Sequence, residues 1–294
     1  MKHVFIINPI SGLGNVKDVA GWVHEYFETS NESYEIRFTE AVGHAQQIAS
    51  EYKDATILYS VGGDGTAHEI LNGMHFDSQL AIIPVGTGND FWRMIEDDKK
   101  DIKDVLYRTI EGVVHNIDVG VANGHYFLNC LNIGVDADVN KRVNAVRTTI
   151  FPRSLVYIYN AVIALAVKKK THLDITMNGE TQRFDTLLTS VMNGKWYGGG
   201  FKSAPLADIE DGLLDVTIVS DVPFWRLPKL FPMYYKGNHL GLDVVETQKV
   251  TELHIHANHP VAVGYDGEVF EYTDIAIKVL QGKLKFRMPV GNNT

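Results

Sequence analysis

The chain has one cysteine, Cys130, among 294 residues. A single cysteine forms neither an intrachain disulfide nor a cysteine-rich zinc site, and it suits a reducing, cytoplasmic setting. Long hydrophobic runs are also missing. The longest, residues 155–167, is interrupted by Asn160 and is shorter than the roughly 20 apolar residues that cross a bilayer. The apolar residues 4–7 are followed by Asn8 and Pro9, too early for a signal peptide. We therefore expect a soluble protein.

Basic side chains are in the minority. The chain has 27 Lys and Arg against 36 Asp and Glu, a formal net charge of −9 at pH 7. Nucleic-acid binding needs a basic face, so we expect no nucleic-acid partner. The hydrophobic content of 45% is that of an ordinary globular protein. At roughly 150 residues per domain, the length predicts about two domains.

In the first part of the chain, short β-branched runs alternate with helical patterns. This alternation is typical of βαβ units on a mostly parallel sheet, and it predicts an N-terminal, Rossmann-like, three-layer α/β nucleotide-binding domain over residues 1–118. Ligands bind such sheets beyond the carboxyl ends of the strands, so the loops 8–14, 62–66 and 86–90 are the candidate site. The strands are expected at 3–7, 34–38, 56–61 and 80–84, and the helices at 16–28, 41–52 and 66–73.

After residue 118 the pattern changes to strands joined by turns. Asn123-Gly124 and Asn178-Gly179 are strong hairpin signals. We predict a mostly antiparallel β-sandwich domain over 119–284, and a C-terminal tail, about 285–294, that packs back on the first domain. Strands are expected at 119–121, 126–132, 173–177, 186–192, 214–220, 250–257 and 275–279, and helices at 155–167 and 223–236.

The sharpest motif is Gly62-Gly63-Asp64-Gly65-Thr66, between an expected buried strand and a helix. Glycines allow the backbone to approach a ligand closely. Phosphoryl transfer needs a carboxylate to hold Mg²⁺ beside the nucleotide phosphates, and Asp64 is the candidate for this catalytic role. The alternative is an Asp-Gly turn that caps a helix.

Two further glycine-bearing loops follow strands. The first, Asn8-Pro9-Ile10-Ser11-Gly12-Leu13-Gly14, precedes a helix start that suits phosphate oxygens, but it matches neither a Walker loop nor the dinucleotide fingerprint. The other, Gly86-Thr87-Gly88-Asn89-Asp90-Phe91, has the same chemistry as the Asp64 motif. We expect these loops to converge on one crevice; ordinary glycine-rich turns are the alternative.

Together these motifs resemble the bacterial soluble diacylglycerol kinase and related lipid kinase family, whose catalytic domain is shared with sphingosine and ceramide kinases. The resemblance implies ATP and Mg²⁺ as cofactors and transfer of the γ-phosphoryl group to a lipid hydroxyl, with diacylglycerol, which gives phosphatidic acid, as the first candidate. Residues 140–185 contribute little to it. It rests on the three loops, on Glu69 and Asn72-Gly73, on Pro205-x-Ala207-x-x-x-Asp211-Gly212-x-Leu214-Asp215, and on Asp266-Gly267-Glu268.

The resemblance also implies roles for single residues. Glu268 matches the general base that accepts the proton of the lipid hydroxyl; without the resemblance, residues 266–268 would be interpreted as a hairpin turn. Asp208, Asp211 and the carbonyl of Leu213 match a loop that holds a structural Mg²⁺, with Asp215 as a further candidate ligand. Asp118 and Asp136 are additional candidates for which a structural role is preferred. The matching ATP-site residues are Asn8, Pro9, Ile10, Ser11, Gly12, Thr39, Gly63, Asp64, Gly65, Thr66, Glu69, Thr87 and Asn89.

A lipid kinase must also reach a bilayer. Basic residues flank the apolar stretch 155–167 and could contact anionic headgroups; a core helix with solvated ends is the alternative. The aromatic and basic residues of 224–236 are a second candidate. We expect a lipid substrate, transient peripheral contact with the inner membrane surface from the cytoplasm, and, by family likeness, a homodimer. The competing hypotheses are a kinase of another lipid or of NAD, and a non-catalytic nucleotide-binding sensor.

Overall fold

The computed structural model describes residues 1–12, 16–96, 101–134 and 171–291. The expected helix at 155–167, its basic flanks and Asp136 lie outside these ranges. The chain forms two compact units: unit 1 comprises Met1–Ile117 and Gly282–Thr294, and unit 2 comprises Asp118–Gln281. The chain thus passes between units at 117–118 and 281–282. The predicted crossings are at 118–119 and 284–285.

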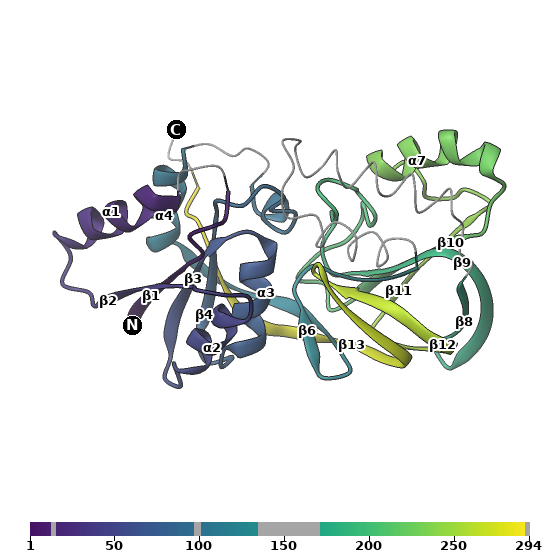
Figure 1. Ribbon diagram of the computed structural model, residues 1–294, viewed down its shortest axis with the longest axis horizontal. Coiled ribbons are helices and arrows are strands. Elements are labelled where there is room, and N and C mark those ends of the chain that lie inside the picture. Colours follow the sequence, from purple (N-terminus) through teal and green to yellow (C-terminus); the bar gives the residue numbers. More distant parts are fainter. Residues whose placement is uncertain (13–15, 97–100, 135–170, 292–294) are drawn as a thin grey trace. The chain divides into compact units, whose positions relative to one another are not determined.

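Unit 1 is built on a parallel sheet with strand order β2-β1-β3-β4 (Figure 1). Every residue of β3 and β4 is buried, because helices cover both faces of the sheet. One face packs on α1 and α4, and α2 and α3 contact each other beside β3. The elements are β1 (Lys2–Ile7), α1 (Val16–Phe27), β2 (Tyr34–Phe38), α2 (His44–Ser50), β3 (Thr56–Gly62), α3 (Asp64–Gly73), β4 (Gln79–Pro84), η1 (Trp92–Met94) and α4 (Ile102–Ile110).

Two features of unit 1 extend the prediction. Helix α4 was not expected; Asp101 caps it by accepting a hydrogen bond from the Lys103 backbone N–H at 2.9 Å. That N-cap, followed by apolar residues at 105, 106 and 110, is the signal that could have revealed it. The chain also returns at its end: Lys285 and Phe286 of β13 pair in parallel with Gln79 and Leu80 of β4. The tail therefore adds a strand to the sheet of unit 1.

Unit 2 is mostly antiparallel. Strands β7 and β8 each pair with both of the long strands β9 and β12. Strand β7 pairs with one part of β9 and of β12, and β8 pairs with another part of each. Asn123-Gly124 and Asn178-Gly179 form two-residue hairpin turns with positive φ at both residues. The elements are β5 (Val113–Ala122), β6 (His125–Phe127), β7 (Cys130–Gly134), β8 (Thr171–Met177), β9 (Glu180–Met192), β10 (Leu214–Ser220), η2 (Phe224–Arg226), α7 (Leu227–Lys236), β11 (Val245–Val250), β12 (Glu252–Tyr265) and β13 (Glu268–Met288).

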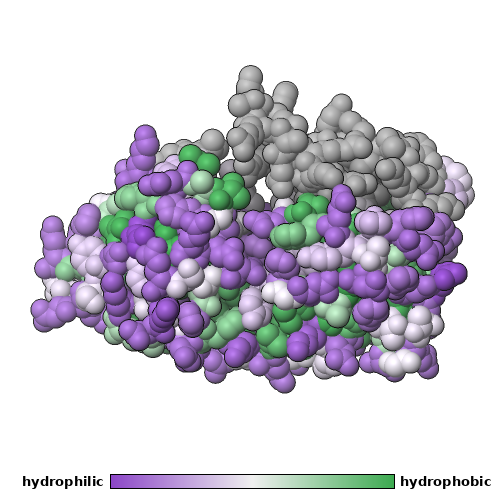
Figure 2. Space-filling model, turned by 60° about the horizontal axis from the view of Figure 1, so that its bottom comes forward, coloured by the Kyte–Doolittle hydropathy of each residue, from purple (hydrophilic) through white to green (hydrophobic). Residues whose placement is uncertain are grey.

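The mixed α/β and antiparallel-β fold class is confirmed, and the main differences concern strand length. The single strand expected at 250–257 is two strands, β11 and β12, and β13 is far longer than the expected 275–279. On the face shown in Figure 2, polar side chains predominate and apolar ones form small separate groups. Among the described residues, no helix has the length and apolar content needed to cross a membrane.

Candidate functional site

The three motif loops of unit 1 meet at the carboxyl edge of its parallel sheet. We call them the first loop (8–12, after β1), the second loop (62–66, between β3 and α3) and the third loop (85–91, after β4). The backbone N–H of Asn8 donates to the Val61 carbonyl at 3.0 Å, and that of Gly86 donates to the Gly62 carbonyl at 3.0 Å. Adjacent parallel strands end at the same edge, so all three loops converge there.

Asp64 ties the second loop to the third. Its Oδ2 accepts a hydrogen bond from the Asp90 backbone N–H at 3.0 Å, and its Oδ1 accepts one from the Phe91 N–H at 3.2 Å. Helix α3 begins at Asp64, with Gly63 as N-cap and no side-chain capping bond. The carboxylate therefore does more than cap a helix, because it accepts hydrogen bonds from a neighbouring loop.

Glycine is required where the loops touch. A Cβ on Gly86 would lie 2.4 Å from the Gly63 Cα, and one on Gly12 would lie 2.0 Å from the Val85 carbonyl oxygen. Gly12 also has a positive φ of 73°. Only glycine leaves room for these approaches, so the close contact of the three backbones follows from glycines that the sequence places one in each loop.

Several predicted ATP-site residues hold the loops together. Asn89, whose φ is 50°, donates from Nδ2 to the carbonyls of Pro84 and Gly86 at 2.8 Å each. Asn8 donates from Nδ2 to Thr66 Oγ1 at 3.2 Å and accepts at Oδ1 from the Ile10 N–H at 3.2 Å. These contacts set the shape of the loops from within.

Thr39 and Glu69 lie next to this edge. Thr39 is buried, and its N–H donates to the Ile7 carbonyl at 2.9 Å. Glu69 Oε2 accepts from the Ala45 N–H at 3.0 Å at the start of α2, a helix whose N-cap is Gly43. Glu69 thus supplies to α2 the acceptor that its N-cap glycine lacks.

The predicted ATP-site residues differ in exposure. Asn89, Thr66 and Thr39 are buried. Pro9, Ile10, Gly65 and Thr87 are exposed, whereas Ser11 and Gly63 are half-buried. Exposed residues on a rigid loop can contact a ligand directly, and the buried ones position them.

Glu268 belongs to unit 2 and follows a tight turn. Tyr265 pairs with Glu268 across a two-residue turn in which Asp266 and Gly267 have φ values of 47° and 106°. The Asp266 carboxylate accepts backbone N–H bonds from Leu128 (2.6 Å), Asn129 (2.9 Å) and Cys130 (2.8 Å). Residues 266–268 are therefore a hairpin turn anchored to residues 128–130, with the half-buried Glu268 at its end. A base role for Glu268 stays a prediction.

The predicted metal loop makes internal hydrogen bonds. Asp208 Oδ1 accepts from the Glu210 N–H and Asp211 Oδ1 accepts from the Leu213 N–H, both at 3.0 Å. Buried Asp118 accepts from the Gly212 N–H at 2.6 Å, which fits the structural role preferred for it. Within the described ranges, no three His, Cys, Asp or Glu side chains are grouped to hold a metal ion. The predicted ligand set contains only two carboxylates, with the Leu213 carbonyl as the third ligand, and it stays a prediction.

The side chain missed by sequence reasoning is Lys249 of β11. Its Nζ lies 2.6 Å from Asp211 Oδ2, on the loop predicted to bind a cation. A lone lysine in a polar strand has no signal in the sequence that links it to a loop 38 residues away. The contact depends on the pairing of β10 with β11.

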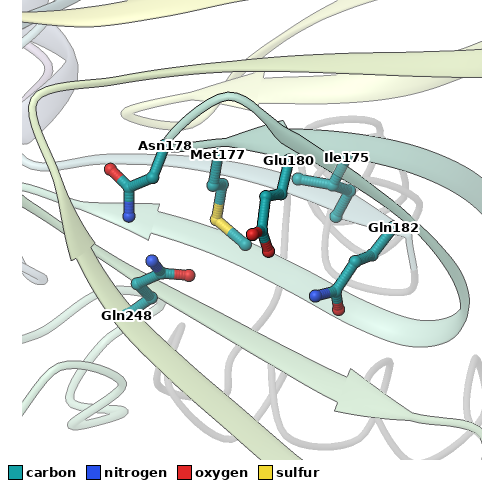
Figure 3. A pocket seen from close by; sticks show the side chains of 6 residues that line it. All are labelled: Ile175, Met177, Asn178, Glu180, Gln182 and Gln248. Atoms are coloured by element: carbon teal, nitrogen blue, oxygen red, sulfur yellow. The ribbon is translucent and has the colours of Figure 1, made fainter.

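A pocket of about 230 Å³ lies elsewhere in unit 2, at the β8–β9 hairpin and β11 (Figure 3). It contains none of the predicted site residues and a single carboxylate, so it does not mark the candidate site. Its lining consists of Ile175, Met177, Asn178, Glu180, Gln182 and Gln248.

Comparison with known protein families divides the chain in the same order. Residues 2–122 match the profile described as the diacylglycerol kinase catalytic domain. Residues 129–287 match the profile described as the YegS C-terminal NAD kinase beta sandwich-like domain.

Individual proteins give the same picture. A diacylglycerol kinase of Mycobacterium tuberculosis (strain H37Rv) is 31% identical, with 86% of this chain and 84% of the relative covered. A diacylglycerol kinase of Bacillus subtilis (strain 168) is 28% identical, with 91% and 90% covered. The crystal structure of a diacylglycerol kinase from Bacillus anthracis strain Sterne aligns with a TM-score of 0.71 over 97% of this chain and 96% of that one, at 24% identity, and so supports the fold.

Proposed function

Because the chain belongs to the diacylglycerol kinase family, we propose that it is a kinase that transfers the γ-phosphoryl group of ATP to a lipid hydroxyl. The observation that carries the proposal is the pair of hydrogen bonds that Asp64 accepts from the backbone of the third loop. They join two glycine-bearing loops at the edge of a parallel sheet, where nucleotides bind in this class of fold.

We assign the ATP site to the carboxyl edge of unit 1. Helix α3 starts at Asp64, and the partial positive charge at a helix N-terminus favours phosphate. The exposed loop residues Pro9, Ile10, Gly65 and Thr87 are placed to contact the nucleotide. Buried Asn89 and Thr66 hold the backbone that carries them.

Asp64 is the residue that would hold Mg²⁺ here. Mg²⁺ is commonly bound through one or two carboxylates together with the phosphates of the nucleotide, and the oxygens of Asp64 offer such a donor set. When bound, Mg²⁺ neutralises charge on the phosphoryl group as it is transferred. The hydrogen bonds of Asp64 to Asp90 and Phe91 fix where its carboxylate points.

We propose Glu268 as the group that accepts the proton of the lipid hydroxyl. Its backbone is held by the turn that Asp266 anchors with three hydrogen bonds. A positioned base contributes about 10²–10⁴-fold to a rate. Positioning of the phosphates contributes independently of this residue.

Diacylglycerol is the first candidate acceptor, since curated relatives of the chain are named diacylglycerol kinase. Such a substrate resides in a bilayer, so we propose transient contact of the enzyme with membranes. NAD is the second candidate, because the second half of the chain matches a domain described as NAD kinase-like. Another lipid acceptor and a nucleotide-binding sensor without turnover complete the set of alternatives.

The test is transfer of ³²P from γ-labelled ATP to diacylglycerol, sphingosine, phosphatidylglycerol and NAD, each with and without Mg²⁺. We expect labelled phosphatidic acid, and its loss in Asp64→Ala. The exposed Asp54 of unit 1 provides the matched control, Asp54→Ala, which should transfer at the wild-type rate. Labelling of NAD alone would contradict a lipid substrate, and binding of ATP without any transfer would indicate a sensor.

A further inference from the structure

The ammonium group of Lys249 lies within the loop that the family resemblance assigns to a structural Mg²⁺. Its Nζ is 2.6 Å from Asp211 Oδ2 and 3.2 Å from the Leu206 carbonyl oxygen. It is also 3.4 Å from Asp215 Oδ2, a charged contact longer than a hydrogen bond. An ammonium has three N–H donors, and three oxygens surround this one.

Strand pairing determines where Lys249 lies. Strands β10 and β11 are antiparallel, and their register sets Asp215 directly opposite Lys249. Side chains at directly opposite positions share one face of a sheet. The pairing of β11 with β10 thus brings the lysine to the loop.

One of the three predicted metal ligands, Asp211, is a direct partner of Lys249. Asp211 accepts from the Leu213 N–H at Oδ1 and from the lysine at Oδ2, and Asp208 accepts from the Glu210 N–H at Oδ1. Mg²⁺ binds oxygen at about 2.0–2.1 Å in octahedral geometry. A Mg²⁺ ion at that distance from Asp211 would lie beside the ammonium group of Lys249, which is bound to the same carboxylate. The two cations would repel each other.

The charges in this cluster depend on one another. The side chains of Lys249, Asp211 and Asp215 are 34%, 25% and 15% exposed. A partly buried carboxylate needs a neighbouring opposite charge for compensation, and the ammonium of Lys249 is the charged partner of both Asp211 and Asp215.

We propose that Lys249 takes the place of the structural Mg²⁺ in this chain, so that the loop from 208 to 215 is held by an internal ammonium group and needs no metal ion. This inference is independent of the proposed kinase activity, because it concerns unit 2 and is tested without turnover.

The test compares thermal unfolding of the full-length protein, without nucleotide, in EDTA and in millimolar MgCl₂. We expect the wild-type Tm to be the same in both, and metal analysis of the purified protein to find no stoichiometric Mg²⁺ or Ca²⁺. A fall in the wild-type Tm in EDTA that MgCl₂ reverses would overturn the proposal. This comparison needs no variant and stands even if a substitution prevents folding.

Two lysine variants test the exchange directly. Lys249→Met removes the cation from two carboxylates, and in EDTA we expect its Tm to fall by about 4 °C or more, with MgCl₂ restoring at least half of the loss. The matched control is Lys278→Met, on an exposed position of β13 in the same unit, which should leave Tm unchanged. A Lys249→Met variant as stable as this control, or one indifferent to MgCl₂, would refute the exchange of metal for lysine.

Discussion

Replacing Asp64 by alanine should destabilise unit 1 as well as abolish transfer. The variant loses two hydrogen bonds to the third loop, and the donors belong to Asp90 and Phe91, which are 5% and 1% exposed. A hydrogen bond to a charged group contributes about 1.5–3 kcal/mol. Asp64 is only half-buried and water can reach part of the gap, so we expect a total loss of about 2–4 kcal/mol.

The assay is urea unfolding followed by fluorescence, with Asp54→Ala as the control for loss of a surface charge. For a unit of this size the expected loss corresponds to a fall in Tm of about 5–12 °C. Activity must be measured well below the Tm of the variant, so that loss of transfer reports on the site. If the free energy of unfolding changes by less than about 0.5 kcal/mol, the range of an ordinary surface substitution, then Asp64 does not join the second and third loops.

Three further predictions concern both units. Glu268→Gln should lower kcat by about 10²–10⁴-fold with little change in the KM for ATP, and retained kcat in steady-state assays would remove Glu268 from the base role. Gly86→Ala should lower both Tm and ATP affinity, because the new Cβ would lie 2.4 Å from the Gly63 Cα; calorimetric titration with ATP showing wild-type affinity would contradict this. His239 is fully buried, and burial lowers its pKa below the ordinary value of 6.5. Its folded-state pKa lies below its unfolded one, so the stability linked to it is present above pH 6.5 and is lost as the pH falls through the folded-state pKa. Urea unfolding between pH 8 and 5 should therefore show a smaller loss of unfolding free energy in His239→Asn than in the wild type. Equal losses in the two proteins would exclude this contribution.

The order of elements and the candidate loops could be predicted because they depend on local pattern. Strand β10 has the limits expected, and α1 begins at Val16 as expected. The two Asn-Gly hairpins also form as predicted, since their residues tolerate positive φ. Helix α4 was missed because it is short, at nine residues, although its N-cap and apolar face are present in the sequence. The length of β13 was missed because long-range pairing extends it beyond its apolar stretch.

The available chemistry could be inferred from the amino-acid sequence: three glycine-bearing loops after strands, with the carboxylates of Asp64 and Asp90 among them, and a family resemblance that covers most of the chain. Glycine content and strand–helix alternation are local properties, and they can be read from neighbours in the chain.

The partner of each polar side chain depends on the three-dimensional arrangement of the chain. This arrangement directs Asp64 to the third loop, Glu69 to the start of α2, and Asp266 to residues 128–130. It also brings the ammonium of Lys249 to Asp211, on a loop where the sequence alone indicated a metal ion. These partners lie 24 to 138 residues apart. Their contacts depend on strand order and register, which no local pattern specifies.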